Sequence, residues 1–325
     1  MLLDFETTKN KFNTKIFENS RYDLIRKMSK YPERYTGIFR STLPKDKLIQ
    51  NISQSHEINF GDAMEILIED IFCLYEYTSL QKKYTIRNGD TLSYDQLFSL
   101  NNRIIFIEQK VRDDHDSTKK RGQIGNFKQK LEHLIDLGYS KENTSSYMYF
   151  IDDAFKKNMN YYNQELIKLN EEGFDCKVVY GEELFEKENI LDGWSSGVVA
   201  FLKLWRENLP GTPELNFDLS PEATFNELKQ LKVGELIKLL KNNEIIENYF
   251  PLIFPNKTTL QFLLEDYRNL ILDDHTSGGE KKKYEEARLL LENAIASYWV
   301  ASWRSCDISL SLNSIAIVNP KLLRM

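Results

Sequence analysis

The fold of this chain is decided by the stretch Arg103-Ile104-Ile105-Phe106-Ile107-Glu108-Gln109-Lys110. Its apolar run is rich in β-branched residues, which is typical of a strand. Because successive strand side chains point to opposite faces, Glu108 and Lys110 share one face. A carboxylate can bind a hard divalent cation, and an adjacent amine can orient or help deprotonate an attacking water. The stretch therefore predicts a strand that ends in a metal-and-water site.

The spacing Glu-x-Lys alone is unspecific, because most such pairs are surface ion pairs. The spacing occurs three times, at Glu108/Lys110, Glu227/Lys229 and Glu280/Lys282. Of these three pairs, only Glu108/Lys110 follows a strand-like run.

Upstream of this strand, the sequence predicts a helix and a hairpin. An amphipathic helix is expected from Asp62 to about Tyr77, opened by Gly61, with Glu65 at the margin of its apolar stripe. Strands are expected at 82–87, 94–100 and 103–111, with turns at Asn88-Gly89-Asp90 and Asn101-Asn102, so that the three form an antiparallel meander.

Downstream, strands and helices alternate. Ser117 is a suitable N-cap for a helix that reaches about Leu137 and ends at Gly138. A strand at 147–151, a helix at 155–172, a strand at 176–180 and a short helix from Glu182 follow. This order favours an α/β fold, with a mixed sheet covered by helices.

Three regions are expected along the chain. Residues 1–57 form an N-terminal helical extension, 58–208 a core, and 209–325 a mainly helical C-terminal region that starts at a linker, 209–213.

Composition limits the function. The chain has 325 residues, 41% hydrophobic and 28% charged, and a net charge of -6, so any nucleic-acid contact must come from a local basic surface. No apolar run reaches transmembrane length, and the first residues lack a signal-peptide pattern. The apolar neighbours of Cys73 and Cys176 predict reduced core thiols in a cytoplasmic protein.

A third charged residue, Asp95, is expected to join Glu108 and Lys110. It lies thirteen residues before Glu108, and in a tight hairpin the two can approach each other across the sheet. Glu65 on the preceding helix could add a further acid. Two carboxylates beside one lysine would build a divalent-metal site, although Glu65 could equally be a solvated helix residue and Asp95 could pair with a basic neighbour.

This chain resembles the PD-(D/E)XK nuclease superfamily in its motifs and in its order of elements. The motifs are Gly61-x-x-x-Glu65, Asp95 and Glu108-x-Lys110, and the elements follow the order helix, three strands, helix, strand. The loop 111–123 resembles type II restriction endonucleases in particular. The resemblance covers about residues 57–187 and implies a restriction-endonuclease-like αβββαβ core. It departs from the usual pattern because Tyr94, rather than proline, precedes Asp95, which leaves Asp90 as a rival.

The resemblance implies that Asp95, Glu108 and the Gln109 carbonyl bind Mg²⁺. Lys110 would position the nucleophilic water, and Glu65 would support the metal or its water shell. The expected reaction is hydrolysis of phosphodiester bonds in double-stranded DNA at a specific sequence, as in a restriction–modification system. Neither a membrane nor a nucleotide cofactor is expected.

The polar loop after Lys110 carries four cations and could face phosphates. Cations at a helix start oppose the helix dipole, and a ligand is a common reason for that. His115 could be a general base or part of a loop network. The expected DNA contacts are Arg112, Ser117, Lys119, Lys120, Arg121 and Gln123.

Two other functions remain open from the sequence: a repair, mobile-element or nicking nuclease of the same superfamily, and an inert DNA-binding or assembly protein. The C-terminal region could serve base recognition or a homodimer, through an amphipathic stripe in 286–303. The stripe comprises Ala287, Leu290, Leu291, Ala294, Ile295, Tyr298 and Trp299.

Overall fold

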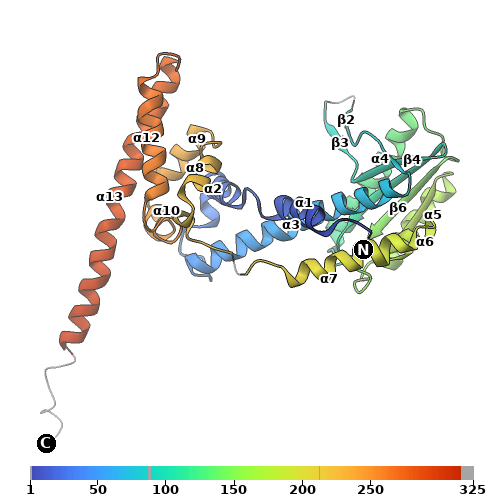
Figure 1. Cartoon of the computed structure of the whole chain (residues 1–325), viewed down its shortest axis with the longest axis horizontal. Helices are drawn as coiled ribbons and strands as arrows, with labels where there is room; N and C mark the ends of the chain where they lie inside the picture. Colours follow the sequence, from blue (N-terminus) through green and yellow to red (C-terminus); the bar gives the residue numbers. More distant parts are fainter. Residues whose placement is uncertain (1, 87–88, 212, 316–325) are drawn as a thin grey trace, which may run out of the picture. The chain divides into compact units, whose positions relative to one another are not determined.

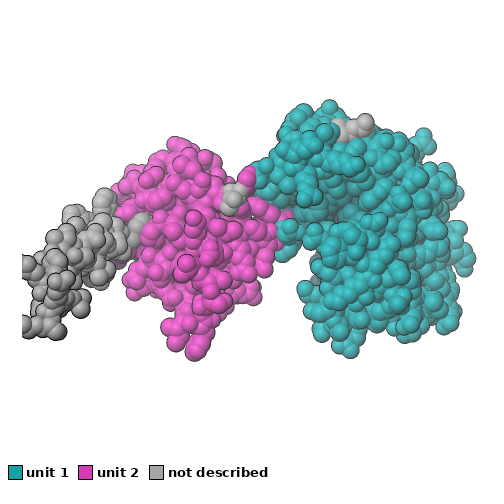
Figure 2. Space-filling view, turned by 90° about the horizontal axis from the view of Figure 1, so that it is seen from below, with its two compact units in different colours: residues 1–18, 57–210 teal, residues 19–56, 211–325 magenta. Residues whose placement is uncertain are grey.

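The computed structural model describes residues 2–86, 89–211 and 213–315, and for 298–315 the backbone alone. The chain forms two compact units (Figure 2). Unit 1 comprises residues 1–18 and 57–210, and unit 2 comprises residues 19–56 and 211–325. Unit 1 thus joins the first helix to the expected core, while unit 2 joins residues 19–56 to the C-terminal helices.

Unit 1 is built on a mixed five-stranded sheet (Figure 1). Its strand order is β1-β4-β5-β6-β7. β4 is antiparallel to both of its neighbours, β1 and β5, whereas β5, β6 and β7 are parallel to one another. Helices α4 and α5 make the two crossovers between the parallel strands. The predicted α/β class is confirmed. The strands are β1 Thr78–Ser79, β4 Gln96–Leu100, β5 Arg103–Lys110, β6 Thr144–Phe150 and β7 Asp175–Tyr180.

The β4–β5 hairpin has the predicted turn. Asn101 and Asn102 both adopt positive φ, 49° and 63°, which a two-residue primed turn requires and which asparagine tolerates. The turn sets the register, in which Leu100 pairs with Arg103 and Gln96 with Ile107. One step further along, Asp95 comes opposite Glu108.

The expected three-strand meander is wrong in its first strand. β2 (Lys83–Thr85) pairs with β3 (Thr91–Ser93) in a separate two-stranded sheet, and the outer neighbour of β4 is β1. The reason is the turn at Gly89, whose φ of +86° reverses the chain early enough for residues 83–85 to meet 91–93. Asn88, expected in this turn, lies outside the described residues.

Helices cover both faces of the sheet. On one face, side chains of α1 (Phe5–Phe17), α3 (Pro44–Leu74) and α7 (Ala200–Glu207) pack on the strands. Also on this face are α6 (Glu183–Lys187) and the π-helix η2 (Gly193–Val199). On the other face lie α4 (Ser117–Asp136) and α5 (Met159–Glu171). Their apolar stripes bury the sheet between two layers.

Two helix boundaries differ from the prediction. The helix expected to open at Gly61 is the C-terminal part of α3, which runs through this glycine from Pro44. Residues Leu48 and Ile52 are buried in unit 2, so apolar contacts also support the earlier turns of α3. The N-cap of α4 is Asp116 rather than Ser117, because its carboxylate accepts from the backbone N–H groups of Thr118 and Lys119.

Unit 2 is helical, as expected for the C-terminal region. Ala287, Leu291 and Ala294 of the 286–303 stripe are buried in its core. The side chains of Tyr298 and Trp299 lie outside the described residues. Its elements are α2 Ser20–Lys30, η1 Pro32–Arg34, η3 Phe217–Leu219, α8 Pro221–Leu228, α9 Val233–Leu240, α10 Asn243–Asn248, α11 Phe250–Ile253, α12 Thr258–Leu272 and α13 Gly278–Ile315.

The expectation of buried thiols holds for one of the two described cysteines. Cys176 is a buried free thiol as expected, whereas Cys73 is exposed, because it lies beside rather than within the buried stripe of α3. None of the described helices is both long and apolar enough to span a bilayer.

Candidate active site

The candidate site lies at the C-terminal end of β5. Because strand side chains alternate, Glu108 and Lys110 share the face on which Phe106 stacks against Phe127 of α4. The Glu108 side chain is only 3% exposed and that of Lys110 is 29% exposed. The carboxylate is therefore enclosed beneath α4, whereas the lysine lies at the edge of the solvent.

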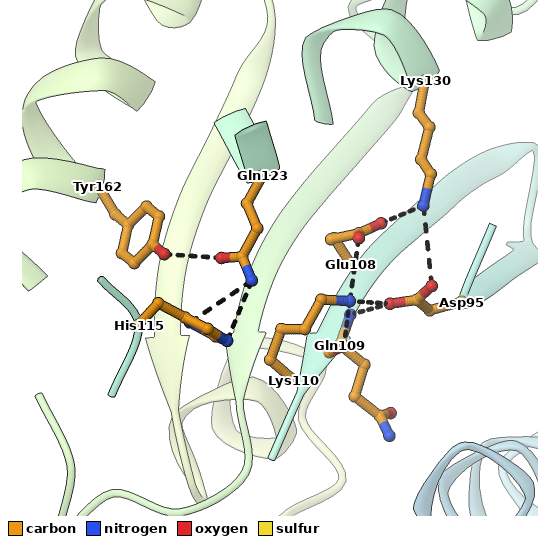
Figure 3. Close-up of polar contacts among 8 residues, drawn as sticks. All are labelled: Asp95, Glu108, Gln109, Lys110, His115, Gln123, Lys130 and Tyr162. Carbon is orange, nitrogen blue, oxygen red and sulfur yellow. Dashed lines mark hydrogen bonds and ion pairs between the residues drawn. The ribbon is translucent and has the colours of Figure 1, made fainter. Parts of the chain in front are cut away.

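Asp95, the loop residue directly before β4, lies beside Glu108 and Lys110 (Figure 3). Its Oδ2 accepts from the backbone N–H of Gln109 at 2.9 Å and from Lys110 Nζ at 2.7 Å. Lys110 Nζ also donates to Glu108 Oε1 at 3.0 Å and to the Gln109 carbonyl at 2.7 Å. The structure thus brings Asp95, Glu108, Gln109 and Lys110 together. The rival Asp90 is exposed at the end of the β2–β3 turn.

Three oxygen atoms converge on one positive charge in this arrangement. Asp95 Oδ2, Glu108 Oε1 and the Gln109 carbonyl oxygen all lie within 3.0 Å of the Lys110 ammonium. Two carboxylates and a carbonyl are a donor set that suits a hard divalent cation such as Mg²⁺. Among the described residues, no group of three or more His, Cys, Asp or Glu side chains is placed to hold a metal ion.

The electrostatics of Lys110 follow from these contacts. Burial alone would lower the pKa of its ammonium, but the carboxylates of Glu108 and Asp95 outweigh burial and raise the pKa. Lys110 is therefore a cation at neutral pH, and it acts as a hydrogen-bond donor in this state.

Glu65, on α3, has a strongly raised pKa. Burial, followed by the negative charges of Asp95 and Asp62, raises its pKa to about 7. The element that holds it is fixed to the site, since Gln96, next to Asp95, donates to the Glu65 carbonyl at 2.6 Å. A carboxyl with this pKa changes charge near neutrality.

Sequence reasoning missed one residue, Lys130 of α4. Its side chain is 3% exposed, pairs closely with Glu108 Oε2 and lies 3.7 Å from Asp95 Oδ1 (Figure 3). The signal was present, because Lys130 occupies the position next to Leu131 on the apolar stripe formed with Phe127 and Leu134. A lysine on such a stripe needs a buried acidic partner.

The polar loop after β5 is held by internal hydrogen bonds. Buried Asp113 accepts from the backbone and side chain of Asn158 and from Tyr180. His115 contacts Gln123, whose carbonyl accepts from Tyr162 at 2.6 Å (Figure 3). These contacts fit the interpretation of His115 as part of a loop network.

The predicted DNA-contacting residues are arranged along the loop and the first turns of α4. Ser117, Lys119 and Arg121 are exposed. Arg112 pairs with Asp152 at 3.4 Å and lies over Phe155, and Lys120 lies over Tyr161. Gln123 is partly buried, and Tyr162 and His115 engage its side-chain amide.

The segment that contains this site is similar to a known family. Residues 74–196 match the family model "HinfI: Type II restriction endonuclease, HinfI". Comparison with curated proteins and with solved structures found no match. The match includes every strand of the five-stranded sheet and the Asp95, Glu108 and Lys110 positions. The resemblance to restriction-endonuclease-like PD-(D/E)XK nucleases is thus confirmed, since residues 74–196 are similar to the HinfI family of type II restriction endonucleases.

Proposed function

We propose that this protein is a type II restriction endonuclease that hydrolyses phosphodiester bonds of double-stranded DNA at a specific sequence and requires Mg²⁺. The observation that carries the proposal is the convergence of Asp95, Glu108 and the Gln109 carbonyl on one cation position. The family match of the surrounding segment supports a nuclease reaction at this place.

In this proposal, Asp95, Glu108 and the Gln109 carbonyl hold the metal. A bound Mg²⁺ would stabilise the negative charge that develops on the phosphate and lower the pKa of a coordinated water. Because Lys110 donates to these three oxygens in the structure, its side chain would have to turn toward solvent for them to bind an ion. Its partial exposure at the end of β5 allows that rotation.

Lys110 then has a role in water positioning. Its ammonium can donate to the attacking water and hold the oxygen toward phosphorus, as the superfamily resemblance implies. Glu65 supports the metal or its water shell when ionised. No covalent bond between enzyme and DNA is required, because the water oxygen forms the new bond to phosphorus directly.

DNA is expected to approach over the loop and the start of α4. Lys119 and Arg121 are exposed cations there, and Asp116 caps the helix, so the backbone at this end is ordered. Phosphate contacts from these residues would position the duplex without reading its sequence. We assign base recognition or dimerisation to the helical unit 2.

The test is incubation of plasmid DNA with the full chain and Mg²⁺, followed by sequencing of the ends. Discrete double-strand fragments that disappear with EDTA are expected. Asp95→Asn is the matched inactive control. Cleavage that persists in EDTA would contradict the metal assignment, and single-strand nicks would favour a nicking enzyme. Binding without cleavage at any divalent ion would favour an inert DNA-binding protein.

A further inference from the structure

We propose that Lys130 permanently fills a second cation position of the Asp95–Glu108 carboxylate pair, so that each active site takes one divalent ion. The inference rests on the proposed function, since it concerns the same metal site. It assigns a role to the buried lysine that the sequence analysis did not identify.

The two carboxylates face two cations. Asp95 Oδ2 and Glu108 Oε1 are directed at Lys110 Nζ, at 2.7 and 3.0 Å. The remaining oxygens, Asp95 Oδ1 and Glu108 Oε2, are directed at Lys130 Nζ (Figure 3). Each carboxylate therefore bridges two positive positions. In two-metal sites, carboxylates bridge two ions in a comparable way.

The two positions differ in how easily their lysine can leave. Lys110 is at a strand end and its side chain is 29% exposed, whereas the Lys130 side chain is 3% exposed. Lys130 lies in the middle of α4, between the buried residues Phe127 and Leu134. A divalent ion can replace Lys110 at the first position, but Lys130 has no comparable route to solvent.

The backbone around Lys130 is also fixed. Tyr94, adjacent to Asp95, donates from its hydroxyl to the Lys130 carbonyl at 3.0 Å. The same hydroxyl contacts His133 Nδ1 at 2.7 Å, one turn along the helix. These bonds anchor the helix backbone at Lys130, and turning its side chain away would leave the buried Glu108 carboxylate without its partner, which is costly.

The charges of the four side chains limit how many metal ions the site can hold. Without a metal ion, the two negative carboxylates are neutralised by the two positive ammonium groups. With a single divalent ion at the Lys110 position, Lys130 would remain paired with Glu108 Oε2, and Glu108 Oε1 would be free to serve as a ligand. Lys130 is thus a positioning residue that acts through Glu108, and a second ion on the same carboxylates is excluded.

The stoichiometry of metal binding tests the inference. Calorimetric titration of the full chain with Mn²⁺, checked by counting bound Mn²⁺ by electron paramagnetic resonance, should give one ion per chain. Lys130→Ala removes the internal cation and should raise the count to two. Lys130→Arg keeps a cation and should stay at one. Lys128→Ala is the control, since Lys128 is on the same helix but pairs with Glu172 outside the site.

Each outcome bears on a separate claim. Two ions per chain in the wild type would overturn the inference while leaving the proposed nuclease function intact. No bound ion in the wild type would instead contradict the metal ligands of the proposed function. One ion in a folded Lys130→Ala variant would also overturn the inference. If that variant does not fold, as judged by circular dichroism, Lys130→Gln is measured by the same criterion, and the wild-type count decides independently.

Discussion

The Asp95 side chain is hydrogen-bonded to the backbone of β5, because its Oδ2 accepts from the N–H of Gln109 at 2.9 Å. This bond places the aspartate one register step beyond the Gln96–Ile107 pair, where it faces Glu108. The position of Asp95 is therefore set by the Asn101-Asn102 hairpin and by a main-chain contact. A proline before the aspartate is not needed for this geometry.

Loss of any member of this group should abolish cleavage. Asp95→Asn, Glu108→Gln and Lys110→Met should each reduce the single-turnover rate by at least about 100-fold, because a metal ligand or water-orienting group contributes several kcal/mol to transition-state stabilisation. Cleavage of end-labelled DNA measures the rate, and circular dichroism verifies the fold.

The control for these variants comes from a pair with the same spacing. Glu280 and Lys282 are both exposed in unit 2, so Lys282→Met should retain wild-type activity. Glu227 is less suitable, because it pairs with Arg21 at 3.0 Å and could affect stability. An active Asp95→Asn variant together with an inactive Asp90→Asn variant would reassign the metal ligand.

Glu65 should make the metal-free protein less stable as pH rises. Its pKa is raised from 4.5 to about 7, so the folded state holds this proton more tightly than the unfolded state. Its favourable contribution is full below about pH 4.5 and is lost as pH rises to about 7. Glu65→Gln lacks this titration. Melting temperatures in EDTA at pH 5 and pH 8 should therefore show the variant gaining on the wild type.

The matched comparison for Glu65 is Asp62→Asn, one turn earlier on α3. The Asp62 side chain is 48% exposed and pairs with Lys15, and its charge contributes to the raised pKa of Glu65, so its replacement should reduce the pH dependence between 4.5 and 7 without removing it. If wild type and Glu65→Gln change in parallel over this range, Glu65 does not titrate near neutrality.

The sequence predicted the elements around Glu108 well, because alternation and turn chemistry are local. The Asn101-Asn102 turn, β5 and the helix that ends at Gly138 all follow from such signals. It failed where tertiary contacts decide. The pairing of β1 with β4, which leaves residues 83–85 in a separate sheet, depends on contacts between segments distant in sequence. The ion pairs of Lys130 depend likewise on how α4 packs on the sheet. A single lysine in an apolar stripe becomes informative only when its acidic partner is known.

Exposed cations at the start of α4 should contribute to DNA affinity. Lys119→Ala and Arg121→Ala should each weaken binding and reduce the slope of log affinity against log salt by about one unit. Fluorescence anisotropy with labelled duplex and Ca²⁺, at several salt concentrations, measures this. Lys168→Ala on α5, where the lysine pairs with Glu165, should leave the slope unchanged. An unchanged slope in both α4 variants would show that this surface faces solvent in the complex.

The packing of η2 on α3 provides a test of the fold itself. A Cβ atom at Gly193 would lie 3.0 Å from Ile71 Cγ2 and 3.1 Å from Phe185 Cδ1. Gly193→Ala should therefore destabilise the protein by about 1–3 kcal/mol in urea unfolding. Gly122→Ala meets no atom within 4 Å and lies inside α4, so it should stabilise by about 0.5–1 kcal/mol. Equal effects of the two variants would contradict the close approach of η2 to Ile71.

The last prediction is that two chains act together on a duplex. One Asp95–Glu108–Lys110 group can hydrolyse one strand, and a near-palindromic site presents two equivalent phosphates related by a two-fold axis. Ala287, Leu291 and Ala294 are already buried in unit 2, so these residues do not supply a free dimer surface. Any association must therefore use other residues or require DNA. Light scattering with uncleaved cognate duplex and Ca²⁺ should show two chains per duplex. A single chain per duplex, with nicked DNA as the product in Mg²⁺, would instead identify an enzyme that cuts one strand.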